Sequence, residues 1–170
     1  MRRREQLLFL EKQALARWHT RVILAFPPGA LVLIACRQIL WHKPWHSPPV
    51  SNGDLLFLTI LLAAVYIRLA TVRLVTEVHS GEIATGLRGL WKQRRISLDH
   101  VRSAEVVTYN AAADFGGYGL RSGRRGTAYI ARGDRAVELT LTNGERVLVG
   151  SQRAEELVQR VREARRQVKI

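Results

Sequence analysis

The chain has 170 residues, which is enough for one modest globular domain and a small appendage. Its formal net charge is +13, and an excess of this size attracts polyanions such as nucleic acid or an anionic lipid surface. The single cysteine, Cys36, excludes an intrachain disulfide and a metal site built from cysteines.

A basic segment, residues 1–21, opens the chain. Within it, residues 5–18 have the apolar spacing of a helix. The apolar side chains of this helix are Leu7, Leu8, Leu15 and Trp18. Beside a membrane span it would lie in the interface with its apolar face down, and otherwise it is an ordinary cytoplasmic helical tail. Both interpretations predict an N-terminal helix.

Two apolar runs in residues 22–72 predict a transmembrane helical hairpin with spans at residues 22–41 and 55–72. The first run is twenty residues long, and a helix of that length rises about 30 Å, the thickness of the hydrocarbon core. The second run is near the lower limit of spanning length. Few charged residues interrupt the region. They are Arg37, Lys43, Asp54 and Arg68.

Two alternatives compete with the membrane hairpin. A cleaved signal peptide is disfavoured, because residues 37–41 at the end of the first run lack the small side chains of a cleavage site. A soluble protein with two buried helices is the other alternative. For a membrane hairpin, the loop between the runs carries only Lys43, while both outer flanks carry arginines. The positive-inside rule then predicts a multi-pass protein of the cell membrane with both termini in the cytoplasm.

From Arg73 onward the apolar pattern changes to a period of two, which predicts six or seven short strands in residues 73–170. Asn143-Gly144 is the strongest hairpin signal. An apolar stripe then predicts an amphipathic C-terminal helix. The stripe consists of Ala154, Leu157, Val161, Ala164 and Val168. The expected fold class is therefore α+β, with the hairpin followed by a small antiparallel β-barrel or sandwich that the terminal helix caps.

Three segments of the soluble part resemble a pleckstrin-homology-like (PH-like) domain. They are Arg94–Leu98 ahead of a strand that ends at Tyr109, Phe115–Arg121, and Val147–Arg153 leading into Glu155-Glu156-Leu157. With its two preceding spans, the chain is similar to bacterial membrane proteins that carry a PH-like domain and have no assigned activity. The resemblance implies a fold and a location. Binding of phosphoinositide headgroups or proteins, as in eukaryotic relatives of the fold, would be an analogy at the level of the fold.

A basic turn is the first candidate binding site. Its cations are Arg88, Lys92, Arg94 and Arg95. Arginine forks suit phosphate oxygens, and each cation near an anionic leaflet contributes about 1 kcal/mol of attraction. The alternative is a solvated positive surface that only sets the membrane topology.

A glycine-rich segment, residues 115–126, is the second candidate. It lacks the lysine of a phosphate-binding P-loop, and Ser122 occupies the third glycine position of G-x-G-x-x-G. The segment is either a structural connection whose aromatic side chains pack on the barrel or a loop that contacts a ligand or partner. The candidate contact residues are Phe115, Tyr118, Arg121, Arg124 and Arg125.

No motif predicts catalysis, a metal ion or a cofactor. His42 and His46 are four residues apart, but Pro44 breaks a helix between them. Asp99 and His100 are neighbours without a recognisable nucleophile motif. The expected function is a membrane-anchored binding or scaffold module, not an enzyme, that engages a protein partner or an anionic lipid surface. The alternative is a membrane-associated nucleic-acid-binding protein, although the chain shows no basic recognition helix.

Overall fold

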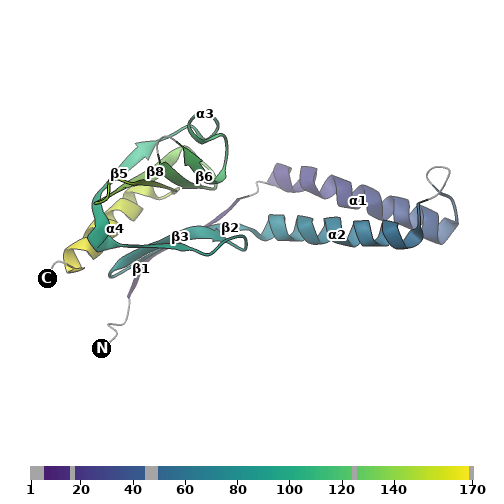
Figure 1. Ribbon diagram of the computed structural model, residues 1–170, viewed down its shortest axis with the longest axis horizontal. Helices are drawn as coiled ribbons and strands as arrows, with labels where there is room; N and C mark the ends of the chain where they lie inside the picture. Colours follow the sequence, from purple (N-terminus) through teal and green to yellow (C-terminus); the bar gives the residue numbers. More distant parts are fainter. Residues whose placement is uncertain (1–5, 16–17, 45–49, 124–125, 169–170) are drawn as a thin grey trace. The chain divides into compact units, whose positions relative to one another are not determined.

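The structure is a computed structural model, and it describes residues 6–15, 18–44, 50–123 and 126–168 (Figure 1). The chain divides into two compact units. The β unit consists of Met1–Leu15 together with Val72–Ile170, and the helical unit is Ala16–Thr71. The N-terminal segment therefore belongs with the C-terminal part of the chain, and the helical unit is inserted between them.

The helical unit contains α1, Trp18–Trp41, and α2, Asn52–Thr71, which pack side by side (Figure 1). Both helices begin earlier than the predicted spans, and both are long and apolar enough to cross a membrane. In the most apolar stretch of each helix, only 11% and 6% of the residues are buried. A helix that is apolar on all sides needs apolar surroundings, and the rest of the described chain covers little of the surface of either helix.

The N-terminal helix predicted within residues 1–21 is wrong over Leu7–Ala14, which form strand β1. β1 pairs antiparallel with β2, Arg73–His79. The side chains of Phe9, Glu11 and Gln13, each two residues from the next, are buried. A strand forms here because β2 offers a row of backbone hydrogen-bonding groups, and this tertiary pairing outweighs the local helical spacing.

The β unit contains two sheets. The first has the order β1-β2-β3-β4, with β3 at Glu82–Arg88 and β4 at Arg94–Ser97. The second has the order β5-β8-β9-β7-β6. Its strands are β5 (Val101–Thr108), β6 (Gly119–Gly123), β7 (Gly126–Ile130), β8 (Arg135–Leu141) and β9 (Arg146–Gly150). Across the described residues no strand pair joins the two sheets, so the closed barrel that was one of the predicted forms is wrong.

Every strand pair is antiparallel except β7 with β9, which is parallel. Three helical elements complete the β unit. They are the 3-10 helix η1 (Leu98–His100), α3 (Ala111–Phe115) and α4 (Ala154–Val168). The predicted C-terminal helix is therefore confirmed.

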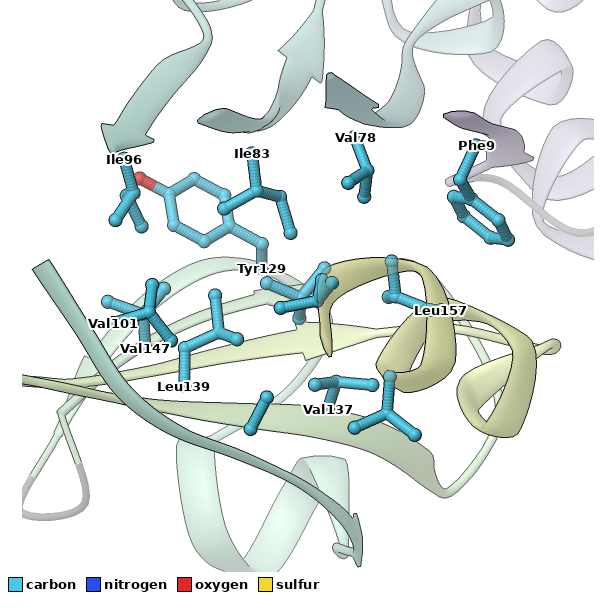
Figure 2. Close-up of a cluster of buried hydrophobic side chains, with 14 of the residues drawn as sticks. Phe9, Val78, Ile83, Ile96, Val101, Tyr129, Val137, Leu139, Val147 and Leu157 are labelled. Carbon is cyan, nitrogen blue, oxygen red and sulfur yellow. The ribbon is translucent and has the colours of Figure 1, made fainter. Parts of the chain in front are cut away.

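One hydrophobic core joins the two sheets and α4. Figure 2 shows Phe9, Val78 and Ile83 of the first sheet facing Val137 of the second sheet and Leu157 of α4. The buried side chains of α4 include Ala154, Leu157, Val161 and Ala164, as the apolar stripe predicts, and the side chain of Val168 lies outside the described residues. Burial of one large aliphatic side chain contributes about 1.5–3 kcal/mol, so burial of Leu157 and Val161 stabilises the packing of α4.

Candidate functional site

The turn between β3 and β4, residues 89–93, lies at the end of the first sheet where the chain connects to the helical unit. Arg88, the last residue of β3, is the Cα partner of Arg73, the first residue of β2. Arg73 is also the Cα partner of Ala14, the last residue of β1. The turn and both connections to the helical unit therefore lie at the same end of the strands of the first sheet.

This turn carries two partly exposed apolar side chains. The N–H groups of Leu90 and Trp91 donate to the carbonyl oxygen of Leu87 at 3.1 and 3.2 Å, which folds the chain back tightly. Leu90 is 36% exposed and Trp91 is 60% exposed, and we call this pair the apolar tip. The predicted site contained the cations of this turn but not the apolar tip, although a Leu-Trp pair directly before Lys92 is a recognisable signal for it.

The structure divides the four predicted cations of the turn into two kinds. Arg94 forms a forked ion pair with Glu145, and each of its terminal nitrogens lies 2.6 Å from a carboxylate oxygen. Arg95 donates to Glu82 at 2.8 Å. Of these four cations, Arg88 and Lys92 are exposed and have no ion-pair partner among the described residues. Two of the four charges are therefore compensated within the β unit.

The Arg94–Glu145 pair stabilises both charged forms. Hydrogen bonding to Arg94 lowers the pKa of the Glu145 carboxyl, and the same hydrogen bond raises the pKa of Arg94. A cleft of about 370 Å³ opens beside the pair, and its wall includes Arg95 and His100. Since both arginines on this wall are already bound to carboxylates, the cleft offers an anion little uncompensated charge.

In its described residues, the glycine-rich segment contains the end of α3, all of β6 and the first residue of β7. Gly116 closes α3 with a φ of 69°, a conformation that favours glycine. Phe115 is buried and packs edge-on against Tyr109, with 6.4 Å between ring centroids. Tyr118 is 42% exposed, and its carbonyl oxygen accepts a hydrogen bond from Nε of Arg121 at 3.1 Å. Phe115 thus has the structural role, whereas Tyr118 and Arg121 lie on the surface; Arg124 and Arg125 lie outside the described residues.

A polar contact between β1 and the start of α4 was not among the predicted features. The buried carboxylate of Glu11 accepts hydrogen bonds from the hydroxyl of Ser151 at 2.5 Å and from the N–H of Gln152 at 3.0 Å. The side chain of Gln13 donates to the carbonyl oxygen of Gly150 at 2.9 Å. Because 140 residues separate Glu11 from Ser151, no local pattern could reveal this contact.

No protein-family model matches the chain, and no curated protein matches it either. Two features of the molecule bear on its function. One is the pair of apolar helices, and the other is the β unit with its basic and apolar turn.

Proposed function

We propose that this protein is a membrane-anchored binding module with a PH-like domain, and that it engages an anionic lipid surface. The observation that carries the proposal is the pairing of Ala14 with Arg73, which joins β1 and β2 in one sheet on either side of the apolar helical unit. An open sheet has polar backbone edges, so it does not form within the hydrocarbon region and must lie on one side of a bilayer. The hairpin then enters and leaves the membrane on the same side.

The charge of the flanking segments gives the orientation. The loop between α1 and α2 carries only Lys43, whereas the β unit carries most of the excess positive charge. The positive-inside rule therefore favours a cytoplasmic β unit, with both termini in the cytoplasm of a multi-pass protein of the cell membrane.

The PH-like assignment is supported by the order of the elements and by their packing. Two mainly antiparallel sheets precede a C-terminal helix, α4, which contacts strands of both sheets. The parallel β7–β9 pair departs from the purely antiparallel arrangement that the resemblance leads us to expect.

Anionic lipid is the partner that the surface chemistry supports best. Three exposed cations lie at the end of the strands where the chain connects to the helical unit, and they have no ion-pair partner in the described part of the chain. They are Arg73, Arg88 and Lys92. Each such cation gains about 1 kcal/mol near an anionic leaflet. These residues support a binding role rather than catalysis.

The membrane topology is tested with the full-length protein in intact cells. In a Cys36→Ser background, Val50→Cys reports the loop between the helices, and Asn143→Cys reports the exposed β8–β9 turn. A membrane-impermeant maleimide is expected to label the first variant in intact cells and the second only after lysis. Release of the protein from membranes by alkaline carbonate, or equal labelling of both positions, contradicts the proposal.

The lipid contact has a separate measurement. A fluorescent donor dye is attached to the introduced cysteine of the Asn143→Cys variant, and the vesicles contain lipids labelled with an acceptor dye. Fluorescence energy transfer should be stronger in phosphatidylglycerol-containing vesicles than in vesicles of phosphatidylcholine alone. The difference should shrink between 0.1 M and 1 M salt, because the screening length falls from about 10 Å to about 3 Å. A β unit that responds neither to anionic lipid nor to salt contradicts the lipid proposal.

A further inference from the structure

We propose that the apolar tip, Leu90 and Trp91, inserts into the headgroup layer of the leaflet that the helical hairpin enters, and so holds the β unit against the bilayer. The proposal rests on the proposed function, since it requires the hairpin to lie in a membrane. Its ligand is the lipid interface itself.

Chain connectivity alone brings the turn close to the end of α2. Thr71 ends α2 and Arg73 begins β2 two residues later, so their Cα atoms are at most about 7 Å apart. Arg88 lies across the strand pair from Arg73, another ~5 Å away. The last residue before the turn is therefore within about 12 Å of the end of α2, whatever the angle between the two units.

Because of the direction of β3, the turn projects beyond the end of the strands at Arg73 and Arg88. β3 runs antiparallel to β2, so the chain reaches this end of the strands at Arg88 and continues past it into the turn. The polar layer on each side of the hydrocarbon core is about 5–8 Å deep. Side chains of the turn can reach this layer without any change in the fold of the β unit.

The chemistry of the turn suits a lipid interface. Trp91 is 60% exposed, and tryptophan concentrates at the membrane–water boundary because its ring is apolar while its N–H can bond to headgroups. Arg88 and Lys92 flank the apolar tip and are exposed, which places cations at the level of the lipid phosphates. An apolar centre with a cationic rim matches an anionic bilayer better than it matches a nucleic acid, which needs no aliphatic contact.

Exposed apolar side chains elsewhere on the β unit provide a matched control. Leu7 is 48% exposed and lies at the other end of β1, opposite His79. Seven residues of strand, about 23 Å, separate Leu7 from Ala14 at the end of the strands that carries the turn. Leu7 is therefore an exposed apolar side chain that is well separated from the apolar tip.

The experiment measures the depth of Trp91 with the full-length chain in vesicles of phosphatidylcholine and phosphatidylglycerol. The substitutions Trp18→Phe, Trp41→Phe and Trp45→Phe leave Trp91 as the only tryptophan. In the control, Trp91→Phe and Leu7→Trp are added to the same background. We expect blue-shifted emission from Trp91 and at least about twofold stronger quenching by lipids brominated near the headgroup than for the control.

Each outcome has one meaning. Water-like emission from Trp91 with quenching equal to that of the control overturns the insertion, even when the protein floats with the vesicles, and leaves the anchored module standing. Failure of the wild-type protein to float with the vesicles overturns the proposed function as well. If the triple phenylalanine variant does not reconstitute, Lys92→Cys in the Cys36→Ser background, labelled with an environment-sensitive dye, gives the same measurement with every tryptophan in place.

Discussion

At the residue scale, Glu11 shows how a buried charge can be satisfied by the chain around it. The residue is 8% exposed, and its carboxylate accepts one hydroxyl hydrogen bond and one backbone hydrogen bond near the start of α4. Anions near a helix N-terminus also interact favourably with the helix dipole. Arg153 adds a hydrogen bond to the carbonyl oxygen of Leu10 at 2.7 Å and lies 4.6 Å from the centre of the Phe9 ring. This cluster fastens β1 to α4.

Glu11→Ala is expected to destabilise the β unit by roughly 1–3 kcal/mol, because it leaves the Ser151 hydroxyl and the Gln152 N–H without their acceptor. Denaturant unfolding of the detergent-solubilised protein measures the change. Glu105→Ala is the control, since Glu105 is exposed and sits opposite another carboxylate, Glu138. The control should change stability by no more than about 0.5 kcal/mol, and equal effects of the two substitutions contradict the role of Glu11.

The Arg94–Glu145 pair predicts a pH-dependent contribution to stability. Hydrogen bonding to Arg94 lowers the folded-state pKa of Glu145 below its ordinary value of 4.5, so the stabilisation is complete above that value. It is lost as the pH falls through the lower, folded-state pKa. The stability difference between wild type and Glu145→Gln should therefore be constant near neutral pH and shrink only in the acidic range. A difference that disappears already between pH 7 and pH 5 would contradict this pairing.

At the element scale, the parallel pairing of β7 with β9 depends on a close backbone approach. Gly126, at the start of β7, has a φ of 103°, and a Cβ placed on it would lie 2.1 Å from the carbonyl oxygen of Arg146. No side chain fits at that distance. This one glycine therefore permits the strand arrangement by which β9 lies between β7 and β8.

Gly126→Ala should destabilise the β unit by more than about 2 kcal/mol, because both its backbone conformation and the contact with Arg146 become unfavourable. Gly133→Ala separates the two causes, since Gly133 also has a positive φ, 85°, but open space around its Cβ position. The control should lose only the conformational part, about 1–2 kcal/mol. Thermal unfolding of both variants measures the difference, and an equal loss removes the packing argument.

At the scale of the whole molecule, the helical unit is an insertion into a folded β unit. The N–H of Leu15 donates to the carbonyl oxygen of Val72 at 3.3 Å, and Ala14 pairs with Arg73. The two ends of the helical unit therefore leave the sheet at neighbouring points. A short turn has the right geometry to join them.

Replacing residues 16–71 with a two-residue Asn-Gly turn is expected to give a water-soluble, monomeric protein that keeps its β-sheet circular dichroism. By contrast, removal of residues 1–71 also deletes β1. That deletion leaves β2 as an edge strand with one side unpaired. It also removes Phe9 from the hydrophobic core, and loss of a buried phenylalanine costs about 3–5 kcal/mol. Size-exclusion chromatography compares the two variants. Equal solubility and stability would show that β1 is not part of the fold.

Features that depend on neighbouring residues could be predicted from the amino-acid sequence alone. The two apolar helices, the change to a period of two at Arg73, the Asn143-Gly144 turn and the stripe of α4 all follow from spacing along the chain, although α1 and α2 begin earlier than predicted. Tertiary pairing makes Leu7–Ala14 a strand, and local spacing could not reveal it because the partner strand β2 lies beyond the whole helical unit. The tertiary structure also decides which cations stay unpaired, since Glu145 and Glu82 reach Arg94 and Arg95 only after the sheets have formed. Local spacing is a property of the chain, whereas pairing depends on which distant groups folding brings together.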